Sequence, residues 1–145
     1  MYKSILLPVD LNHENSWKAA LPVALELAKT FGAELHLVTI VPSVGMTMVG
    51  MYLPEDFEKR ALEKAAADLH AFATKNVPKG VRGKSHVAHG VIREEILKAA
   101  DTLHCNLIVM APRKRSLQDL LVGPNTEYVV RHAKCSVLVA HAEGT

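Results

Sequence analysis

The chain has 145 residues with a formal net charge of +2, and 49% of the residues are hydrophobic while only 5% are aromatic. A chain of this length buries roughly 70% of its unfolded surface in one core, so we expect a single domain over residues 1–145 that needs no disulfide or metal. The apolar runs are shorter than the ~20 residues of a membrane span, and the few scattered aromatic residues do not form the stacking platforms of a nucleic-acid-binding surface.

The first part of the chain predicts a strand, a helix and a second strand. Residues 4–9 (SILLPV) are too few for a helix and are followed by turn-forming residues, so they predict a buried strand. Over residues 16–31 the apolar positions recur at helical spacing, and Gly32 provides the stop. Residues 33–41 are apolar and β-rich and precede Pro42, as expected for a second strand.

The middle of the chain predicts a long loop, a helix and an edge strand. Residues 42–54 hold three methionines, two glycines and two prolines without a period, so we expect a loop that is either a lid or a segment packed over a groove or a partner. The apolar pattern from Phe57 to Phe72 predicts a long helix that breaks at residues 76–80. Residues 81–88 alternate in the manner of a half-exposed edge strand.

The last part repeats the alternation of short apolar runs and helices. His89 and Gly90 are predicted as a turn into a helix over residues 92–103, and residues 106–110 (NLIVM) form a buried strand. After a basic loop at residues 111–115 and a hydrophobic stretch, Gly123 opens a short helix that runs to His132. Residues 136–140 (SVLVA) are the last predicted strand.

This order of elements predicts an α/β fold in which a five-stranded parallel sheet is covered by helices on both faces. The common strand orders are 3-2-1-4-5 and 2-1-3-4-5, and the edge-like third strand favours 3-2-1-4-5. In that order the strands that follow the first are added on one side of it and the fourth and fifth on the other, so the switch point lies between the first and fourth strands. Ligands bind at such switch points.

Three segments meet at this switch point: residues 8–10, residues 110–115 and residues 123–126. A helix N-terminus beside Arg113, Lys114 and Arg115 predicts an anionic ligand, while a slot between Val9 and Ile40 suits a purine. Each piece also has a purely structural reading, in which Asp10 caps the next helix, the three basic residues form a solvated turn, and Gly123 and Pro124 are an ordinary helix entry.

The histidines and cysteines predict little chemistry. His86 and His89 are three apart in a strand and point to opposite faces, which disfavours a zinc site between them. Two cysteines make no disulfide framework, and residues 1–10 lack the pattern of a signal peptide, so we expect a cytoplasmic protein.

Three blocks of sequence, ILLPVD, HGVIREEIL and NLIVMAPRKRSLQDLLVGPNTEYVVRHAKCSVLVA, together resemble the universal stress protein family over essentially the whole chain. The resemblance implies the Rossmann-like, adenine nucleotide alpha hydrolase-like version of the fold. It also implies a homodimer formed by antiparallel pairing of the last strand, between Ser136 and Ala140. Many members bind ATP through a pattern G-x2-G-x9-G followed by Ser or Thr.

The chain departs from that pattern. Ala111 and Lys114 replace the first two glycines, the loop to Gly123 is one residue shorter, and Pro124 lacks the N–H that a phosphate would accept. The added positive charges could hold phosphates through side chains instead. In these features the chain is similar to the F/G-type branch of the family.

Carried over position by position, the resemblance assigns twelve residues to a nucleotide. The adenosine part falls to Pro8, Val9, Asp10 and Ile40; ribose and phosphates fall to Met110, Ala111, Arg113, Gly123, Asn125 and Thr126, with Lys114 and Pro124 at motif positions of altered chemistry.

Two functions follow as hypotheses. The first is a regulatory ATP-binding or adenine-nucleotide-binding module of the stress response, with Mg2+ accompanying the nucleotide and the homodimer as the working unit. The second is a nucleotide-free dimeric interaction protein of the same fold that uses the loop at residues 46–51. The sequence lacks the loops and motifs of flavin, receiver and adenylyl-transfer proteins, so we do not expect an enzyme.

Overall fold

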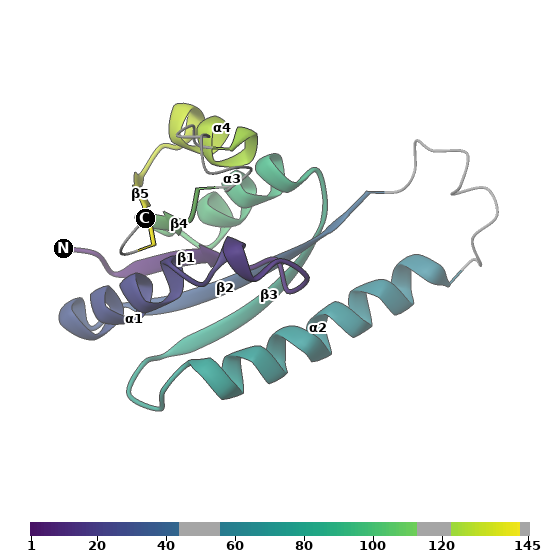
Figure 1. Ribbon diagram of the computed structural model, residues 1–145, viewed down its shortest axis with the longest axis horizontal. Helices are drawn as coiled ribbons and strands as arrows, with labels where there is room; N and C mark the ends of the chain where they lie inside the picture. The colour runs from purple at the N-terminus through teal and green to yellow at the C-terminus, as the bar shows by residue number, and fades with distance from the viewer. Residues whose placement is uncertain (44–55, 113–122, 143–145) are drawn as a thin grey trace.

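The computed structural model describes residues 1–43, 56–112 and 123–142 (Figure 1). Within these residues the sheet has five parallel strands in the order β3-β2-β1-β4-β5, which confirms the predicted order. The strands are β1 Ser4–Pro8, β2 Glu34–Pro42, β3 Gly83–Gly90, β4 Leu107–Met110 and β5 Ser136–Val139. The helices are α1 Ala20–Phe31, α2 Phe57–Asn76, α3 Ile92–Thr102 and α4 Pro124–His132, and a short 3-10 helix, η1, spans Glu14–Ser16.

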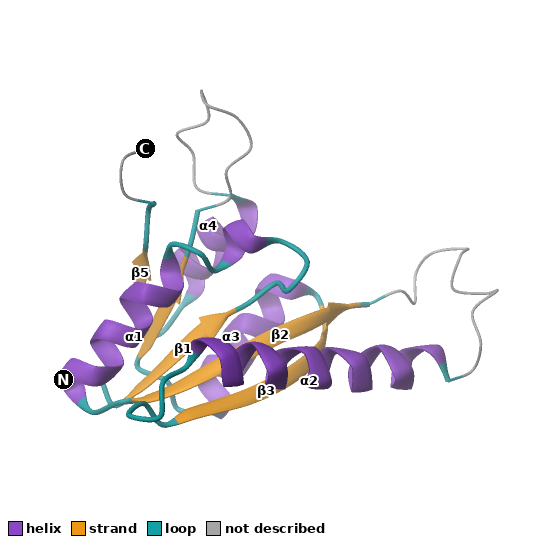
Figure 2. Cartoon of the chain, turned by 60° about the horizontal axis from the view of Figure 1, so that its bottom comes forward, coloured by secondary structure: helices purple, strands orange, loops and turns teal. Residues whose placement is uncertain are grey.

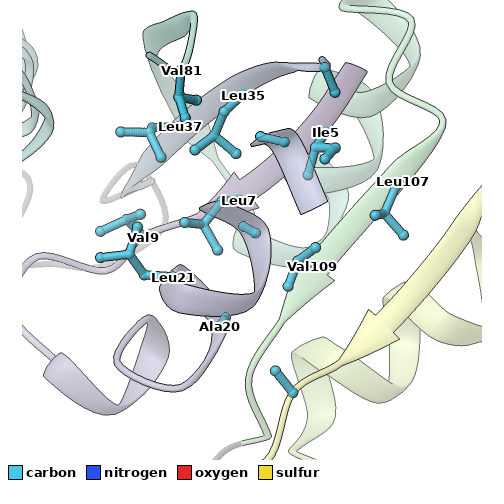
Figure 3. Packing of buried hydrophobic residues seen from close by; sticks show 14 of the residues in the cluster. Ile5, Leu7, Val9, Ala20, Leu21, Leu35, Leu37, Val81, Leu107 and Val109 are labelled. Carbon is cyan, nitrogen blue, oxygen red and sulfur yellow. The ribbon is translucent and has the colours of Figure 1, made fainter. Parts of the chain in front are cut away.

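Helices cover the sheet on both faces (Figure 2). On one face α1 and α2 pack on the odd-numbered residues of β1, and Figure 3 shows Ile5 and Leu7 meeting Leu35 and Leu37 of β2 there. On the other face α3 and α4 pack on Leu6. Successive side chains of a strand point to opposite faces, so a strand between two helical layers must be apolar at every position. This is why the strand sequences are continuous aliphatic runs.

Strands β2 and β3 continue beyond the end of β1. The pairing of β1 with β2 ends at Pro8 opposite Val38, whereas β2 and β3 remain paired as far as Pro42 and Gly90. The two longer strands and α2 therefore extend past the rest of the sheet (Figure 1). The ends of β2 and β3 therefore project beyond the carboxyl end of β1.

Two predicted boundaries are corrected by the structure. The turn predicted at His89 and Gly90 belongs to β3, because the hydrogen-bonded register with β2 carries the strand to Gly90. The first helix begins at Ala20 and not at residue 16, because residues 14–16 are taken up by η1. Pro22 therefore lies in the first turn of α1, where its missing N–H has no intrahelical partner to lose.

Two predicted features fall largely outside the described residues. Of the long loop predicted at residues 42–54, only the first two residues are described, and of the basic loop only residues 111 and 112. None of the described helices has the length and hydrophobicity that a membrane crossing requires.

Gly32 ends α1 in the left-handed conformation, with φ of 63°. A Cβ added there would meet no atom within 4 Å, so the only penalty of Gly32→Ala is conformational. We expect this substitution to lower the free energy of unfolding by about 1 kcal/mol in urea denaturation. Gly80→Ala is the matched control, because the added Cβ again meets nothing and the backbone does not have positive φ. Equal stabilities of the two variants would contradict the assignment.

Candidate functional site

A cavity of about 560 Å³ opens at the carboxyl ends of β1, β2 and β4. It lies at the switch point of the sheet, because β2 flanks β1 on one side and β4 flanks it on the other. Binding sites of small molecules and cofactors commonly have volumes of roughly 300–1,000 Å³ and lie at such switch points. The cavity therefore has the size and place of a ligand site.

One wall of the cavity is aliphatic. Val38 and Ile40 face it from β2, Ile92 and Ile96 from the first two turns of α3, and Met110 from the end of β4. Ile96 and Met110 also belong to the core between the sheet and α3, so their positions are set by packing. A rigid apolar wall of this kind suits one face of a flat heteroaromatic ring.

Asp10, which also lines the cavity, is held in a tight polar turn. One carboxylate oxygen accepts the N–H of Asn12 at 3.0 Å, and the other lies 2.8 Å from Nδ1 of His13. The backbone N–H of Asp10 donates to the hydroxyl of Ser16 at 2.9 Å, and that hydroxyl lies 3.1 Å from the carbonyl of Asp10. The reading of Asp10 as the cap of the next helix is wrong, because α1 begins ten residues later with Ala19 at its N-cap.

The N-terminus of α4 forms the third side. Gly123 is the N-cap and Pro124 occupies the first turn. The first bond of the helix runs from the N–H of Glu127 to the carbonyl of Gly123, so the N–H groups of Asn125 and Thr126 have no acceptor within the helix. The hydroxyl of Thr126, a residue only 3% exposed, donates to the carbonyl of Ala111 at 3.2 Å. This bond ties the start of α4 to the end of β4 and aims the positive end of the helix dipole at the cavity.

The cavity brings together ten of the twelve residues that the sequence assigned to a nucleotide. Arg113 and Lys114 lie outside the described residues. The ten are Pro8, Val9, Asp10, Ile40, Met110, Ala111, Gly123, Pro124, Asn125 and Thr126.

Sequence reasoning gave no individual role in the site to eight lining residues, which come from three places. Some lie on η1 and its approach, which fold back on Asp10. Others lie on β2 and at the start of α3, where they were read only as parts of the strand and the helix. Pro112 follows β4, within the segment that was expected at the switch point. Ile92 and Ile96 are spaced by one helical turn at the start of a helix that directly follows the predicted edge strand. This spacing could have indicated that both side chains lie near the carboxyl ends of the strands. The eight are His13, Asn15, Ser16, Val38, Pro42, Ile92, Ile96 and Pro112.

A second polar cluster lies away from this cavity, on the face of the sheet that α3 covers. Nδ1 of His36 on β2 lies 2.9 Å from Nε2 of His86 on β3, and Nε2 of His36 lies 3.3 Å from Oε2 of Glu34. His89 contacts Glu58 of α2 at 3.1 Å, so the prediction that His86 and His89 face opposite ways is confirmed. The partner that sequence spacing could not reveal is His36.

Burial controls the protonation of this pair. Removal from water lowers the pKa of His36, against a smaller opposing effect of Glu34, and it likewise lowers the pKa of His86, which the neighbouring His36 and Lys84 depress further. Both imidazoles are therefore favoured in the neutral form.

The model of the universal stress protein family matches residues 1–141. Universal stress protein G of Shigella flexneri is 29% identical over 141 residues, which cover 96% of this chain and 99% of the relative. The solved structure of hypothetical protein MJ0577 superposes with a TM-score of 0.74 at 24% identity and covers 100% of this chain and 99% of its own. A universal stress protein from Archaeoglobus fulgidus in complex with dAMP superposes with a TM-score of 0.61 at 21% identity, covering 96% and 98%.

The histidine pair predicts a pH-dependent stability. Because both pKa values lie below the ordinary 6.5 in the folded protein, the unfolded chain binds more protons at mildly acidic pH. The contribution is complete above about pH 6.5 and is lost as the pH falls through the folded pKa values. We expect the free energy of unfolding to decline between pH 7.5 and 5.5 in urea titrations.

His86→Gln should flatten this decline, whereas His70→Gln, which changes an exposed residue of α2, should leave the slope as it is in the wild type. The same slope in wild type and His86→Gln would show that the pair does not control the pH response.

Proposed function

The chain belongs to the universal stress protein family, and on that premise we propose that it is a regulatory adenine-nucleotide-binding module that works as a homodimer. A single family domain over residues 1–145 carries the site. The observation that supports this function most directly is the cavity at the switch point, with an aliphatic wall on one side and a helix N-terminus on another.

The adenine ring is proposed to lie against the aliphatic wall. Val9, directly after β1, and Ile40 on β2 line the same cavity as Ile92 of α3, so apolar surface meets the ring from more than one element. Asp10 is 45% exposed at its side chain, and its carboxylate retains lone pairs beyond the two contacts with Asn12 and His13. It can therefore accept a hydrogen bond from a ribose hydroxyl.

The phosphates are proposed to lie at the start of α4. The N–H groups of Asn125 and Thr126 are available to an anion there, and Gly123 lets its oxygens approach the backbone. Pro124 contributes no donor, so Arg113 and Lys114 are proposed to supply the charge that the backbone lacks. Asp10 is the only acidic residue lining the described cavity, so Mg2+ would be held mainly by the phosphates of ATP.

In this function no residue is assigned a catalytic role. The protein would act in the cytoplasm, where ATP is abundant and thiols such as Cys105 and Cys135 stay reduced. A universal stress protein of the same fold has been solved with dAMP, which supports an adenine nucleotide as the ligand. The second candidate is a nucleotide-free interaction protein, favoured by Pro124 and by Ala111 in place of glycine.

Binding of adenine nucleotides is the first test. In calorimetric titrations with ATP and Mg2+, with adenosine monophosphate and with adenosine, we expect binding of all three, tightest for the phosphorylated ligands. Asn125→Asp places a negative charge at the helix start, which favours the helix but repels phosphate. It should weaken the two phosphorylated ligands by roughly 3- to 10-fold, since about 1.4 kcal/mol is tenfold in affinity, and should leave adenosine unchanged.

Asn125→Gln is the neutral control and should bind like the wild type. The absence of heat and of any thermal shift at millimolar nucleotide would reject nucleotide binding and favour the interaction protein.

The dimer is proposed to form through β5, which lies at the edge of the sheet. The N–H of Ala140 donates to the carbonyl of Met110 at 2.7 Å, so alternation turns the N–H groups of Val137 and Val139 outward. Antiparallel pairing with a second copy would satisfy these groups and cover the edge.

Val139→Pro removes one outward N–H without touching the ladder to β4, and edge strands tolerate proline. We expect sedimentation velocity at micromolar concentration to show a dimer for the wild type and for Val139→Thr, and a shift toward monomer for Val139→Pro. A monomeric wild type would refute the dimer.

A further inference from the structure

The side chain of His13 contacts Asp10, and both residues line the cavity. Nδ1 of His13 lies 2.8 Å from Oδ2 of Asp10. The side chain of His13 is 76% exposed, and that of Asp10 is 45% exposed. A contact between side chains at this exposure contributes little to folding, so the stability of the fold does not account for it.

The turn that carries His13 is held by backbone bonds. The N–H of His13 donates to the carbonyl of Asp10 at 3.0 Å, and the carbonyl of His13 accepts the N–H of Ser16, also at 3.0 Å. His13 is the N-cap of η1, but its side chain makes no capping hydrogen bond. The imidazole can therefore be replaced without loss of the bonds that form the turn.

His13 and Asn12 each hold one oxygen of the Asp10 carboxylate. Oδ1 accepts the backbone N–H of Asn12 at 3.0 Å. A carboxylate can only accept, so Nδ1 of His13 carries the hydrogen that reaches Oδ2. One donor on each oxygen opposes rotation of the carboxylate, and each oxygen retains a further acceptor site. The carboxylate therefore offers a ligand two acceptors in one fixed plane.

We propose that His13 is a positioning residue, which holds Oδ2 of Asp10 and thereby makes the cavity select a ribonucleotide over the 2′-deoxyribonucleotide. A ribose presents adjacent hydroxyl donors at its 2′ and 3′ positions, and two acceptors in one plane match both of them. A 2′-deoxyribose leaves one acceptor without its donor. This inference rests on the proposed nucleotide-binding function and names the class of sugar that the same site takes.

The selection depends on the orientation of the carboxylate. A bond to one hydroxyl tolerates rotation of the carboxylate, whereas bonds to two hydroxyls require a single orientation, and a group that is already oriented loses less freedom on binding. Because the side chain of Asp10 is 45% exposed, water partly replaces a missing hydroxyl. We therefore expect a modest preference for ribose, roughly 3- to 10-fold.

Adenosine monophosphate and 2′-deoxyadenosine monophosphate, titrated separately by calorimetry at pH 7.5, are the probes. Both carry the same base and phosphate, so the contributions of the aliphatic wall and of α4 cancel in the ratio of their dissociation constants. The wild type should bind the ribonucleotide roughly 3- to 10-fold more tightly. His13→Phe keeps a ring without a donor and should bring the two dissociation constants close together. It should leave the affinity for the deoxynucleotide and the melting temperature unchanged.

Two further variants separate the donor from the ring and from the turn. His13→Asn retains a donor, because Nδ2 of asparagine lies close to the place of Nδ1 in the imidazole, and it should preserve the ratio. Glu14→Gln is the matched control, because it changes an exposed residue of η1 that does not line the described cavity. It should bind both nucleotides like the wild type.

Selection through His13 is disproved if the wild type binds both nucleotides equally, or if His13→Phe retains the wild-type ratio. It is also disproved if His13→Phe weakens both nucleotides by the same factor, which would mark a structural role in the turn, or if His13→Asn loses the ratio as His13→Phe does. Each of these results leaves nucleotide binding intact. If neither monophosphate nor ATP binds, the proposed function is rejected together with the role of His13.

Discussion

Burial of β1 on both faces is the constraint on which the rest of the described structure depends. Ile5, Leu6 and Leu7 are fully buried, and each face of the strand is covered by a different pair of helices. Because the chain leaves β1 to build β2 on one side and returns to add β4 on the other, the connections run in opposite directions from this strand. The cavity lies between those diverging connections. The packing of β1 between its two neighbouring strands therefore also forms the site.

The polar groups around the cavity serve the fold and the site together. The carboxylate of Asp10 organises the turn that brings η1 back over the end of β1, and the hydroxyl of Thr126 holds the start of α4 against the end of β4. Groups already oriented by hydrogen bonds lose little freedom when a ligand arrives. In this chain Ala111 and Pro124 replace residues of a glycine-rich phosphate loop. The orientation of the backbone N–H groups at the start of α4 is therefore the main feature by which the backbone there can bind an anion.

The pair of His36 and His86 shows how a parallel sheet creates chemistry between distant residues. They are fifty positions apart, and each alone is an unremarkable strand residue. The register of β2 with β3 and the shelter of α3 remove water from both rings, which makes a neutral, hydrogen-bonded pair more favourable than two charged ones. The same contact links the edge strand β3 to its neighbour β2.

The sequence alone determined the class of fold and the strand order, because strand periodicity, glycine and proline positions and the edge-like alternation of β3 are local signals. Ten of the lining residues followed from the resemblance to the universal stress protein family, applied at the switch point of that strand order. Only the tertiary structure decided what depends on register and on connections through space. The contact of His36 with His86 requires the pairing of β2 with β3. The exposure of Ile92 and Ile96 to the cavity requires α3 to begin beside the end of β2, and the closure of the turn at Asp10 requires η1 to fold back. Periodicity reports which face of an element is apolar, but the neighbour on that face is set by long-range packing.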